Sequence, residues 1–294
     1  MSNPITDEIS LVARSLEMRI RNGVQLETEY GLNRSGREQA YKLLDDLMAC
    51  LFPGIFTNEN IPKGELAAFL PEILTSISGQ MKALFTLASE HNRNRENVDE
   101  SPPEARWEGL TQDFINVLPL IRDMLSDDID AAFRRDRSAH SADEVVLSYP
   151  CIEAIATYRL AHVIANLGIP LIPRIMSQRA QSRTGIDIHP SAEIGRRFFI
   201  DHGTGVVIGE TSTIGNNVKI YQGVTLGSIS WPDEKMGFED NEKRHPDVED
   251  DVIIYANAVI LGGKTTIGKG AVIGGNTWIT KSVPPGARVF NRKG

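Results

Sequence analysis

The first half of the chain carries the hydrophobic spacing of amphipathic helices. Apolar residues recur every three or four positions in REQAYKLLDDLMACLF, ELAAFLPEILTSISGQMKALFTLA and WEGLTQDFINVLPLIRDML, which is the pattern of helices that bury one face. Pro53-Gly54, residues 62–64 and the polar stretch 91–104 separate these segments, and we expect the last of them to be a loop. Further helices are expected over Ala142–Leu167 and after Pro170. Residues 1–183 are therefore predicted to form a helical domain.

After Thr184-Gly185 the apolar positions recur every six residues instead. Neither the period of a helix nor the alternation of a simple strand sustains this spacing, whereas the hexapeptide repeat of a parallel β-helix does. Each repeat forms one short strand and one corner, with an aliphatic anchor in the core and Gly or Asn where a corner needs positive φ. We predict an α+β multidomain chain with a left-handed parallel β-helix at 184–294. Thirteen anchors, at three per turn, predict a little over four coils: Ile188, Ile194, Ile200, Ile208, Ile214, Ile220, Leu226, Val248, Ile254, Ile260, Ile267, Ile273 and Ile279.

Two interruptions of this period are the places where function is expected. The step from Ile200 to the next anchor is eight residues, across DHGTGVV, and about twenty residues replace the regular coil after Leu226. Extra residues in a solenoid loop outward, and outward loops commonly carry binding residues. His202 lies in the first interruption and His245 at the end of the second. The second interruption is predicted to be an extruded loop at 228–247.

Composition narrows the class of protein. The net charge of −8 argues against a general binder of nucleic acid or anionic membranes, because phosphate groups select basic surfaces. The two cysteines, Cys50 and Cys151, form no CxxC pair and are expected in apolar packing. The N-terminus lacks the apolar run of a secretory signal, and no segment has 18 consecutive apolar residues. These features favour a reduced, cytoplasmic compartment.

Three segments resemble the serine O-acetyltransferases, a family of hexapeptide-repeat acyltransferases. They are DIHPSAEIGRRFFIDHGTGVVIGETSTIGNNVKIYQGVTLG (187–227), KRHP (243–246) and SVPPGA (282–287), and the resemblance covers most of 136–287. DHGTGVVIGET is far more specific than the six-residue period, which many acyltransferases share. The resemblance implies transfer of acetyl from acetyl-CoA to the hydroxyl of L-serine, giving O-acetyl-L-serine for cysteine biosynthesis, without a metal.

The family's pattern also implies roles for individual residues. His202 corresponds to the general base that takes the proton of the serine hydroxyl, and a neutral imidazole suits this work because its pKa lies near neutrality. Asp187 corresponds to the carboxylate that orients the imidazole and stabilises its charged form. The implied substrate-binding residues are Asp136 and Asp201 for the ammonium group, Arg244 for the carboxylate, and His245 and Glu210 as pocket supports. The residues alone also allow roles without function: Asp136 could be a charged surface residue, and Glu210 could cap a corner of the β-helix.

Acetyl-CoA is expected in a groove between two β-helices, where small corner residues leave room for its pantetheine arm. By family position the cofactor-binding residues are Gly227, Ser228, Ala256, Gly275 and Lys281, with Lys264 as a further candidate for the phosphates. The resemblance implies a homotrimer or a hexamer formed from two trimers, with some site residues contributed by different subunits. Cysteine is implied as a feedback inhibitor, because it mimics serine.

Three departures from the family pattern are expected to matter. The loop GSISWPDEKMGFEDNE is longer and more acidic than the family's short glycine loop, and Glu153 stands where the family often has His. The chain ends at Gly294 without the tail, ending in Ile, that docks onto cysteine synthase, so no complex through such a tail is expected.

Other functions remain open from the sequence. The same base could acetylate another hydroxyl, on homoserine or a sugar, although Arg244 and the two aspartates favour an amino acid. Some β-helix enzymes bind zinc through three histidines, but His189, His202 and His245 lack the close pair that such a site uses. A non-catalytic β-helix scaffold would leave the candidate site residues without a purpose.

Overall fold

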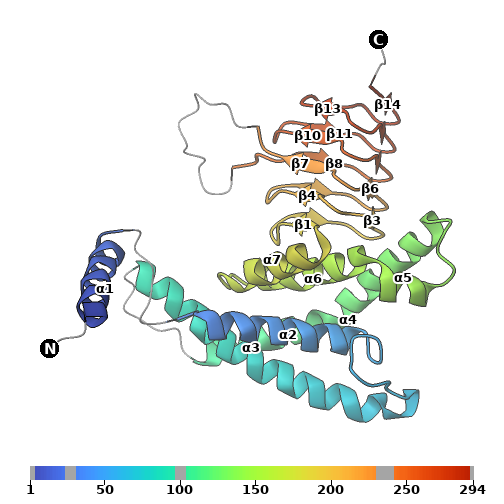
Figure 1. Ribbon diagram of the computed structural model, residues 1–294. Helices are drawn as coiled ribbons and strands as arrows, with labels where there is room; N and C mark the ends of the chain where they lie inside the picture. The colour runs from blue at the N-terminus through green and yellow to red at the C-terminus, as the bar shows by residue number, and fades with distance from the viewer. Residues whose placement is uncertain (1–3, 24–30, 97–103, 230–241, 292–294) are drawn as a thin grey trace.

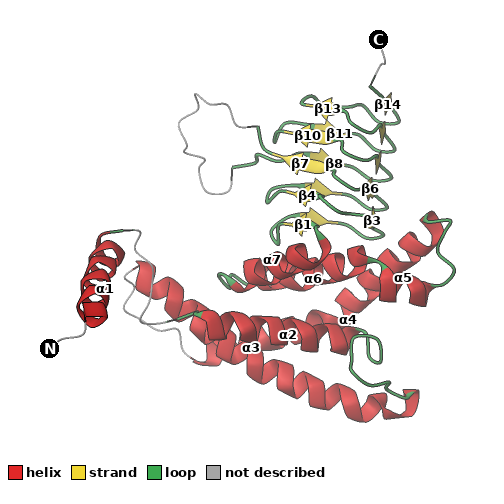
Figure 2. Ribbon diagram, viewed as in Figure 1, coloured by secondary structure: helices red, strands yellow, loops and turns green. Residues whose placement is uncertain are grey.

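The structure is a computed structural model that describes residues 4–23, 31–96, 104–229 and 242–291 of the 294-residue chain. A group of helices forms one half, and a column of short strands stands on it (Figure 1). Figure 2 shows the same division by type of secondary structure. The helices are α1 (Pro4–Asn22), α2 (Arg34–Leu51), the short 3₁₀ helix η1 (Lys63–Glu65), α3 (Leu66–Glu96), α4 (Glu104–Arg135), α5 (Ala142–Ser148), α6 (Pro150–Asn166) and α7 (Ile172–Thr184). The predicted fold class, a helical region followed by a parallel β-helix, is confirmed.

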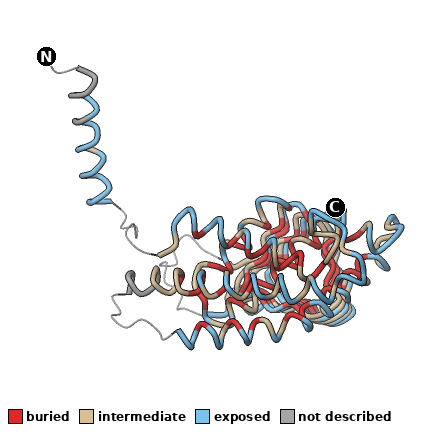
Figure 3. Tube along the Cα trace, turned by 90° about the horizontal axis from the view of Figure 1, so that it is seen from below, coloured by how far each residue is buried: buried red, intermediate tan, exposed pale blue. Residues whose placement is uncertain are grey.

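Helices α2, α3, α4, α6 and α7 pack around a core of large apolar side chains, among them the fully buried Leu47, Phe85 and Phe114. Helix α6 is the most deeply buried, because it lies against α4 and α7 and also contacts strands of the β-helix. Helix α1 stands away from this group, and the side chains described on it are mostly exposed (Figure 3). None of the helices that the structure describes has an apolar stretch long enough to cross a lipid bilayer.

Two of the predicted helix boundaries are wrong. The single helix expected over Ala142–Leu167 is two helices, because Tyr149 takes an extended conformation with φ −89° and ψ 115° and Pro150 starts α6. Proline fits the first turn of a helix, where its missing N–H is no loss, but it disfavours helical backbone in the residue before it. The loop expected at 91–104 is also shorter than predicted, because α3 continues to Glu96. Residues 97–103 lie outside the described part of the chain.

The β-helix has three parallel sheets. Sheet A contains β1 (Asp187–Ile188), β4 (Val207–Ile208), β7 (Thr225–Gly227), β10 (Val259–Leu261) and β13 (Trp278–Ile279). Sheet B contains β2 (Glu193–Ile194), β5 (Thr213–Ile214), β8 (Asp247–Val248) and β11 (Thr266–Ile267). Sheet C contains β3 (Phe199–Asp201), β6 (Lys219–Tyr221), β9 (Ile253–Ile254), β12 (Val272–Ile273) and β14 (Arg288–Val289). The chain runs from sheet A to B to C in each coil, so the three sheets form the sides of a triangular prism. We call the lines of corners between the sheets the A–B edge, the B–C edge and the C–A edge.

All thirteen predicted anchors are buried. They stack directly on one another between coils, as Ile188 does on Ile208 and Ile208 on Leu226. Sheets A and C have five strands each, so there are about five coils rather than a little over four. The additional coil is formed by Val283, which bridges to Ile267, and by β14. The six-residue spacing did not predict it, because its residues depart from that period. Most of the extruded loop predicted at 228–247, residues 230–241, lies outside the described residues.

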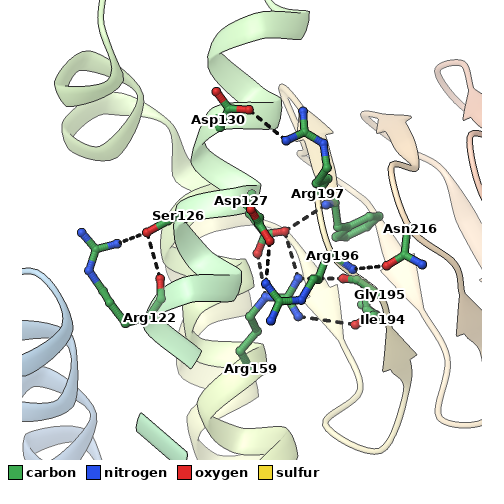
Figure 4. Close-up of polar contacts among 12 residues, drawn as sticks. Arg122, Ser126, Asp127, Asp130, Arg159, Ile194, Gly195, Arg196, Arg197 and Asn216 are labelled. Atoms are coloured by element: carbon green, nitrogen blue, oxygen red, sulfur yellow. Dashed lines mark hydrogen bonds and ion pairs between the residues drawn. The ribbon is translucent and has the colours of Figure 1, made fainter. Parts of the chain in front are cut away.

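A buried ion pair joins the two halves. Asp128 of α4 accepts hydrogen bonds from Arg159 of α6 at 2.6 and 2.9 Å and from the backbone N–H of Phe198 at 2.9 Å. Arg159 also donates to the carbonyl oxygens of Ile194 and Gly195, at 3.4 and 2.8 Å (Figure 4). Because these partners lie on the B–C edge of the first coil, the pair fixes the β-helix on the helices. Partly exposed pairs surround it, Arg196 with Asp127 and Arg197 with Asp130.

Candidate active site

The corner after β3 carries the first interruption of the six-residue period. His202 and Gly203 both have positive φ, 59° and 94°, and the two additional residues project from the C–A edge. The side chain of His202 is 72% exposed. Gly203 turns beneath it, where a Cβ atom would lie 2.5 Å from the Cδ1 atom of Ile186. Other corners of the β-helix, such as Asn217 and Asp251, have the same left-handed backbone, so it is the added length that distinguishes this corner. The outward loop expected at this step is therefore present, with the imidazole on its outside.

Three predicted site residues meet in one cavity. Asp136, Asp201 and His202 line a pocket of about 330 Å³ together with Ser138, Tyr149, Pro150, Cys151 and Ile200. Asp136 follows α4, whereas Asp201 ends β3, so the pocket forms only because the helical half is docked on the β-helix. The Nε2 atom of His202 lies 3.8 Å from the Oδ1 atom of Asp201. This arrangement places an exposed base beside two carboxylates.

Asp136 is held by neutral donors. Its Oδ1 atom accepts hydrogen bonds from the backbone N–H and the hydroxyl of Ser138, at 2.9 and 2.6 Å, and its Oδ2 atom accepts one from Tyr149 Oη at 2.5 Å. The Ser138 and Tyr149 hydrogen bonds lower the pKa of Asp136 to about 2, because they stabilise the carboxylate. The bond to Asp136 raises the pKa of Tyr149 to about 12. Asp136 is therefore a fixed negative charge at neutral pH.

Asp201 has a cationic partner that the sequence analysis missed. The Nζ atom of Lys219 lies 2.8 Å from the Oδ2 atom of Asp201, and the lysine side chain is only 7% exposed. Lys219 also donates to the carbonyl oxygen of Arg135, at 3.1 Å, and its Nζ atom lies over the rings of Phe199 and Tyr221. Burial lowers the pKa of Lys219, but its bonds to Asp201 and Tyr221 outweigh this and raise the pKa above its usual value. The signal in the sequence was a lysine on the next coil, in register with Phe199, two residues before Asp201.

Asp187 lies next to the corner insertion that carries the imidazole. Asp187 begins β1, and the inserted corner packs over the residues before it, with the N–H of Gly205 donating to the carbonyl oxygen of Gly185 at 2.8 Å. Among the described residues of this single chain, no hydrogen bond or ion pair joins Asp187 to His202. The two residues thus share the C–A edge, and the dyad stays a prediction.

The remaining predicted substrate-binding residues gather on the A–B edge. The Nη2 atom of Arg244 forms an ion pair with a carboxylate oxygen of Glu210, and His245 lies beside them with only 8% of its surface exposed. His189 stands on the same edge, two coils away from His245. Burial is the main cause that lowers the pKa of both imidazoles to about 4, so both are neutral at pH 7. Because His202 lies on the C–A edge, the structure brings it together with neither Arg244 nor His245 in one chain.

The predicted cofactor residues divide between the same two edges. Ala256 and Gly275 stack on successive coils of the C–A edge, where a Cβ atom at Gly275 would lie 2.9 Å from the carbonyl oxygen of Ala256. Gly227 ends β7, and Ser228 and Lys281 follow strands of sheet A, so these residues lie toward the A–B edge, as does Lys264. Small residues thus keep the C–A edge narrow above the histidine corner.

Glu153, which stands where the family often has His, does not line the histidine pocket. Its carboxylate pairs with Arg183 and lines a separate cavity of about 470 Å³ among the helices. Cys151 does line the histidine pocket, but burial raises the pKa of its thiol to about 12. Cys151 is therefore a poor nucleophile, and the other cysteine, Cys50, has a pKa that burial also raises.

The histidines do not converge on one point. His189 and His245 are on the A–B edge, whereas His202 is on the C–A edge. Over the described ranges, no cluster of three or more His, Cys, Asp or Glu side chains is placed to hold a metal ion.

Solved structures share this fold. Serine acetyltransferase 1 of Entamoeba histolytica, in complex with L-cysteine, is 31% identical, with a TM-score of 0.71 over 87% of this chain and 97% of that chain. A serine acetyltransferase in complex with CoA is 27% identical, with a TM-score of 0.54 over 86% of this chain and 93% of that chain. The fold and the corner histidine define an acyltransferase built on a parallel β-helix.

The sequence comparison identifies the family. "Serine acetyltransferase, plasmid" of Synechococcus elongatus is 43% identical over 261 residues, which cover 85% of this chain and 80% of that relative. No protein-family model matches the chain. At this identity and coverage, the chain belongs to the serine acetyltransferase family.

Proposed function

We propose that this chain transfers the acetyl group of acetyl-CoA directly to the hydroxyl of L-serine, with His202 as the general base. The observation that carries this proposal is the pocket in which the exposed imidazole stands beside Asp136 and Asp201. An imidazole has its ordinary pKa near neutrality, so its neutral form accepts a proton readily at pH 7. The inert thiol of Cys151 supports direct attack over a covalent acetyl-cysteine.

The chemistry follows from the positions of these groups. The imidazole of His202 takes the hydroxyl proton as the serine oxygen attacks the thioester carbonyl carbon. The C–S bond then breaks, and the imidazolium returns its proton to the leaving sulfur, which gives CoA and O-acetyl-L-serine. The carboxylate of Asp201, 3.8 Å from Nε2, stabilises the imidazolium while it exists. Asp187 stands on the same edge and is the second carboxylate proposed for this role.

Of the two carboxylates in the pocket, Asp136 should attract the serine ammonium group more strongly than Asp201. Asp201 already pairs with Lys219, whereas the described partners of Asp136 are the neutral donors Ser138 and Tyr149. Asp136 therefore offers the larger uncompensated charge to an ammonium group. Its position on the helical half makes serine binding depend on the docking of that half onto the β-helix.

The carboxylate of serine is bound by Arg244 and His245 of a neighbouring subunit. Those residues lie on the A–B edge and His202 on the C–A edge, so one chain supplies two incomplete halves. A trimer in which each A–B edge faces the next chain's C–A edge completes the site three times, and pairing of helical halves would give a hexamer. Acetyl-CoA then lies between neighbouring prisms along Gly227, Ser228, Ala256, Gly275 and Lys281. A structural neighbour in complex with CoA supports the choice of co-substrate.

Cysteine is proposed to inhibit by occupying the serine site. It carries the same ammonium and carboxylate groups, with a thiol in place of the hydroxyl. The L-cysteine complex of the Entamoeba histolytica neighbour supports this view.

An assay of CoA thiol release with L-serine, L-homoserine and a galactoside tests the proposal. We expect turnover with serine, and His202→Ala should lower kcat by roughly 10²–10⁴-fold through loss of the general base. His140→Ala, an exposed histidine of the helical half, is the matched control and should keep the wild-type rate. Near-normal turnover of His202→Ala at saturating substrates, or preference for homoserine or the sugar, would refute the assignment.

A further inference from the structure

The hydroxyl of Thr211 uses all of its hydrogen-bonding capacity on the segment that carries Arg244 and His245. Thr211 Oγ1 accepts from the backbone N–H of Arg244 and from that of His245, both at 3.0 Å. It also lies 3.0 Å from the Nδ1 atom of His245. A hydroxyl has two acceptor positions and one donor proton, so its proton is left for Nδ1. Thr211 therefore fixes both the backbone and the ring of this segment.

A second contact makes the protonation of the His245 ring unambiguous. The backbone N–H of Thr211 donates to the Nδ1 atom of His245 at 3.1 Å. A backbone N–H can only donate, so Nδ1 must be the unprotonated nitrogen of the neutral ring. The proton of neutral His245 is consequently on Nε2. Within the described part of the chain, Nε2 has no hydrogen-bond partner, so it is free to donate to a ligand.

The residues on either side of Glu210 complete this cradle. The His245 ring lies against Gly209, where a Cβ atom would be 2.0 Å from Cδ2 and 2.2 Å from Nε2. Any side chain at 209 would therefore displace the ring. Glu210 forms the ion pair with Arg244. The tripeptide Gly209-Glu210-Thr211 thus has three roles. Gly209 leaves space for the His245 ring, Glu210 pairs with Arg244, and Thr211 fixes the tautomer of His245.

We propose that Thr211 is a positioning residue that holds His245 as the Nε2–H tautomer, so that His245 donates a hydrogen bond, beside Arg244, to an anionic oxygen of the acceptor substrate. This inference rests on the proposed function for the identity of that oxygen, the carboxylate of serine. The tautomer itself follows from contacts within one chain. The low pKa of His245, about 4, is consistent with this role, because the ring stays neutral over the working pH range.

Steady-state kinetics of Thr211→Val, which removes the hydroxyl at nearly constant volume, test the positioning role. We expect KM for serine to rise roughly tenfold, the order of one lost hydrogen bond, with KM for acetyl-CoA unchanged. Thr211→Ser should restore the wild-type value. Thr266→Val, on sheet B in the fourth coil, is the matched control and should change neither constant. Because Thr211→Val keeps the backbone N–H on Nδ1, an unchanged KM for serine, or an equal rise in both KM values, would overturn the positioning role of the Thr211 hydroxyl.

Substitution of the ring tests the donor position without touching Thr211. The amide nitrogen of glutamine reaches the place of Nε2, whereas that of asparagine reaches the place of Nδ1. We expect His245→Gln to keep KM for serine within a few fold of wild type and His245→Asn to raise it by about tenfold or more. Equal loss in both variants, or better binding by His245→Asn, contradicts the tautomer.

Neutron diffraction from deuterated crystals of the full chain separates this inference from the proposed function. Deuterium on Nε2 of His245, with Nδ1 bare, is the expected result, and deuterium on Nδ1 would refute the inference whatever the substrate is. Absence of turnover with serine in the wild-type enzyme would refute the proposed function, while the neutron result would still decide the tautomer.

Discussion

Removing one partner of the buried Asp128–Arg159 pair should destabilise the chain more than any exposed pair does. Both side chains are almost fully buried, at 0% and 3% exposure, and Asp128→Ala would leave the guanidinium without its counter-ion. Loss of one partner of a buried, hydrogen-bonded pair costs about 3–5 kcal/mol. The N–H of Phe198 also loses its acceptor. We therefore expect a loss of about 3–5 kcal/mol, against the 5–15 kcal/mol that typically separates folded from unfolded chains.

Urea denaturation at pH 7 and one protein concentration, followed by circular dichroism and tryptophan fluorescence, measures this loss. Lys82→Ala breaks an exposed pair with Glu108 and should cost less than about 1 kcal/mol. In a double-mutant cycle, Asp128→Ala combined with Arg159→Met should cost less than the sum of the two single variants. Each single variant leaves one buried charge without its partner, whereas the double variant removes both charges. A loss below about 1 kcal/mol for Asp128→Ala, or strict additivity, would refute this reasoning.

Four further predictions concern the site. Asp136→Asn should raise KM for serine about tenfold or more, because it removes the uncompensated charge, whereas an unchanged KM in the thiol-release assay would exclude that role. Ala256→Trp should raise KM for acetyl-CoA about tenfold or more by filling the C–A edge, with KM for serine unchanged; equal effects on both would argue against a cofactor groove there. Gly209→Ala should weaken serine binding by displacing the His245 ring, measured as a higher KM for serine at unchanged KM for acetyl-CoA. Finally, burial lowers the pKa of His245 to about 4, so the unfolded chain binds the additional proton between about pH 6.5 and 4. The free energy of unfolding should fall by about 1–3 kcal/mol as the pH decreases through that window, and His245→Gln should show a smaller fall in parallel urea titrations.

The parts of the fold that follow from repeated spacing were predictable from sequence. Each anchor such as Ile214 meets the same surroundings one coil above and below, so one rule places all thirteen. Counting the anchors in threes also shows on which edge of the prism a corner residue lies. The count alone places His202 on the C–A edge and Arg244 on the A–B edge. Helix ends were less predictable, since the break at Pro150 depends on one residue within an otherwise continuous apolar pattern.

The polar contacts of the site were beyond sequence reasoning, because they join residues from different coils or different halves. Lys219 reaches Asp201 from the next coil, and Thr211 reaches His245 across 34 positions of sequence. The direction of the Glu153 side chain was equally beyond sequence reasoning, because its helix turns it toward Arg183 and away from the pocket that Cys151 lines. Which face of a helix meets which neighbour depends on packing angles that the six-residue rule does not contain.

The two-residue insertion at His202 shows how this architecture can acquire chemistry with little disturbance. The strands on either side, β3 and β4, keep their register with β6 and β7, so every aliphatic layer inside the prism is unaffected by the additional length. A globular core would have to repack around such a change, whereas a solenoid transmits it only to the solvent side of one vertex. Each corner is therefore a separate position for evolution or engineering. Its loop can be lengthened and its reactive side chain moved or replaced, while the β-helix beneath it remains the same.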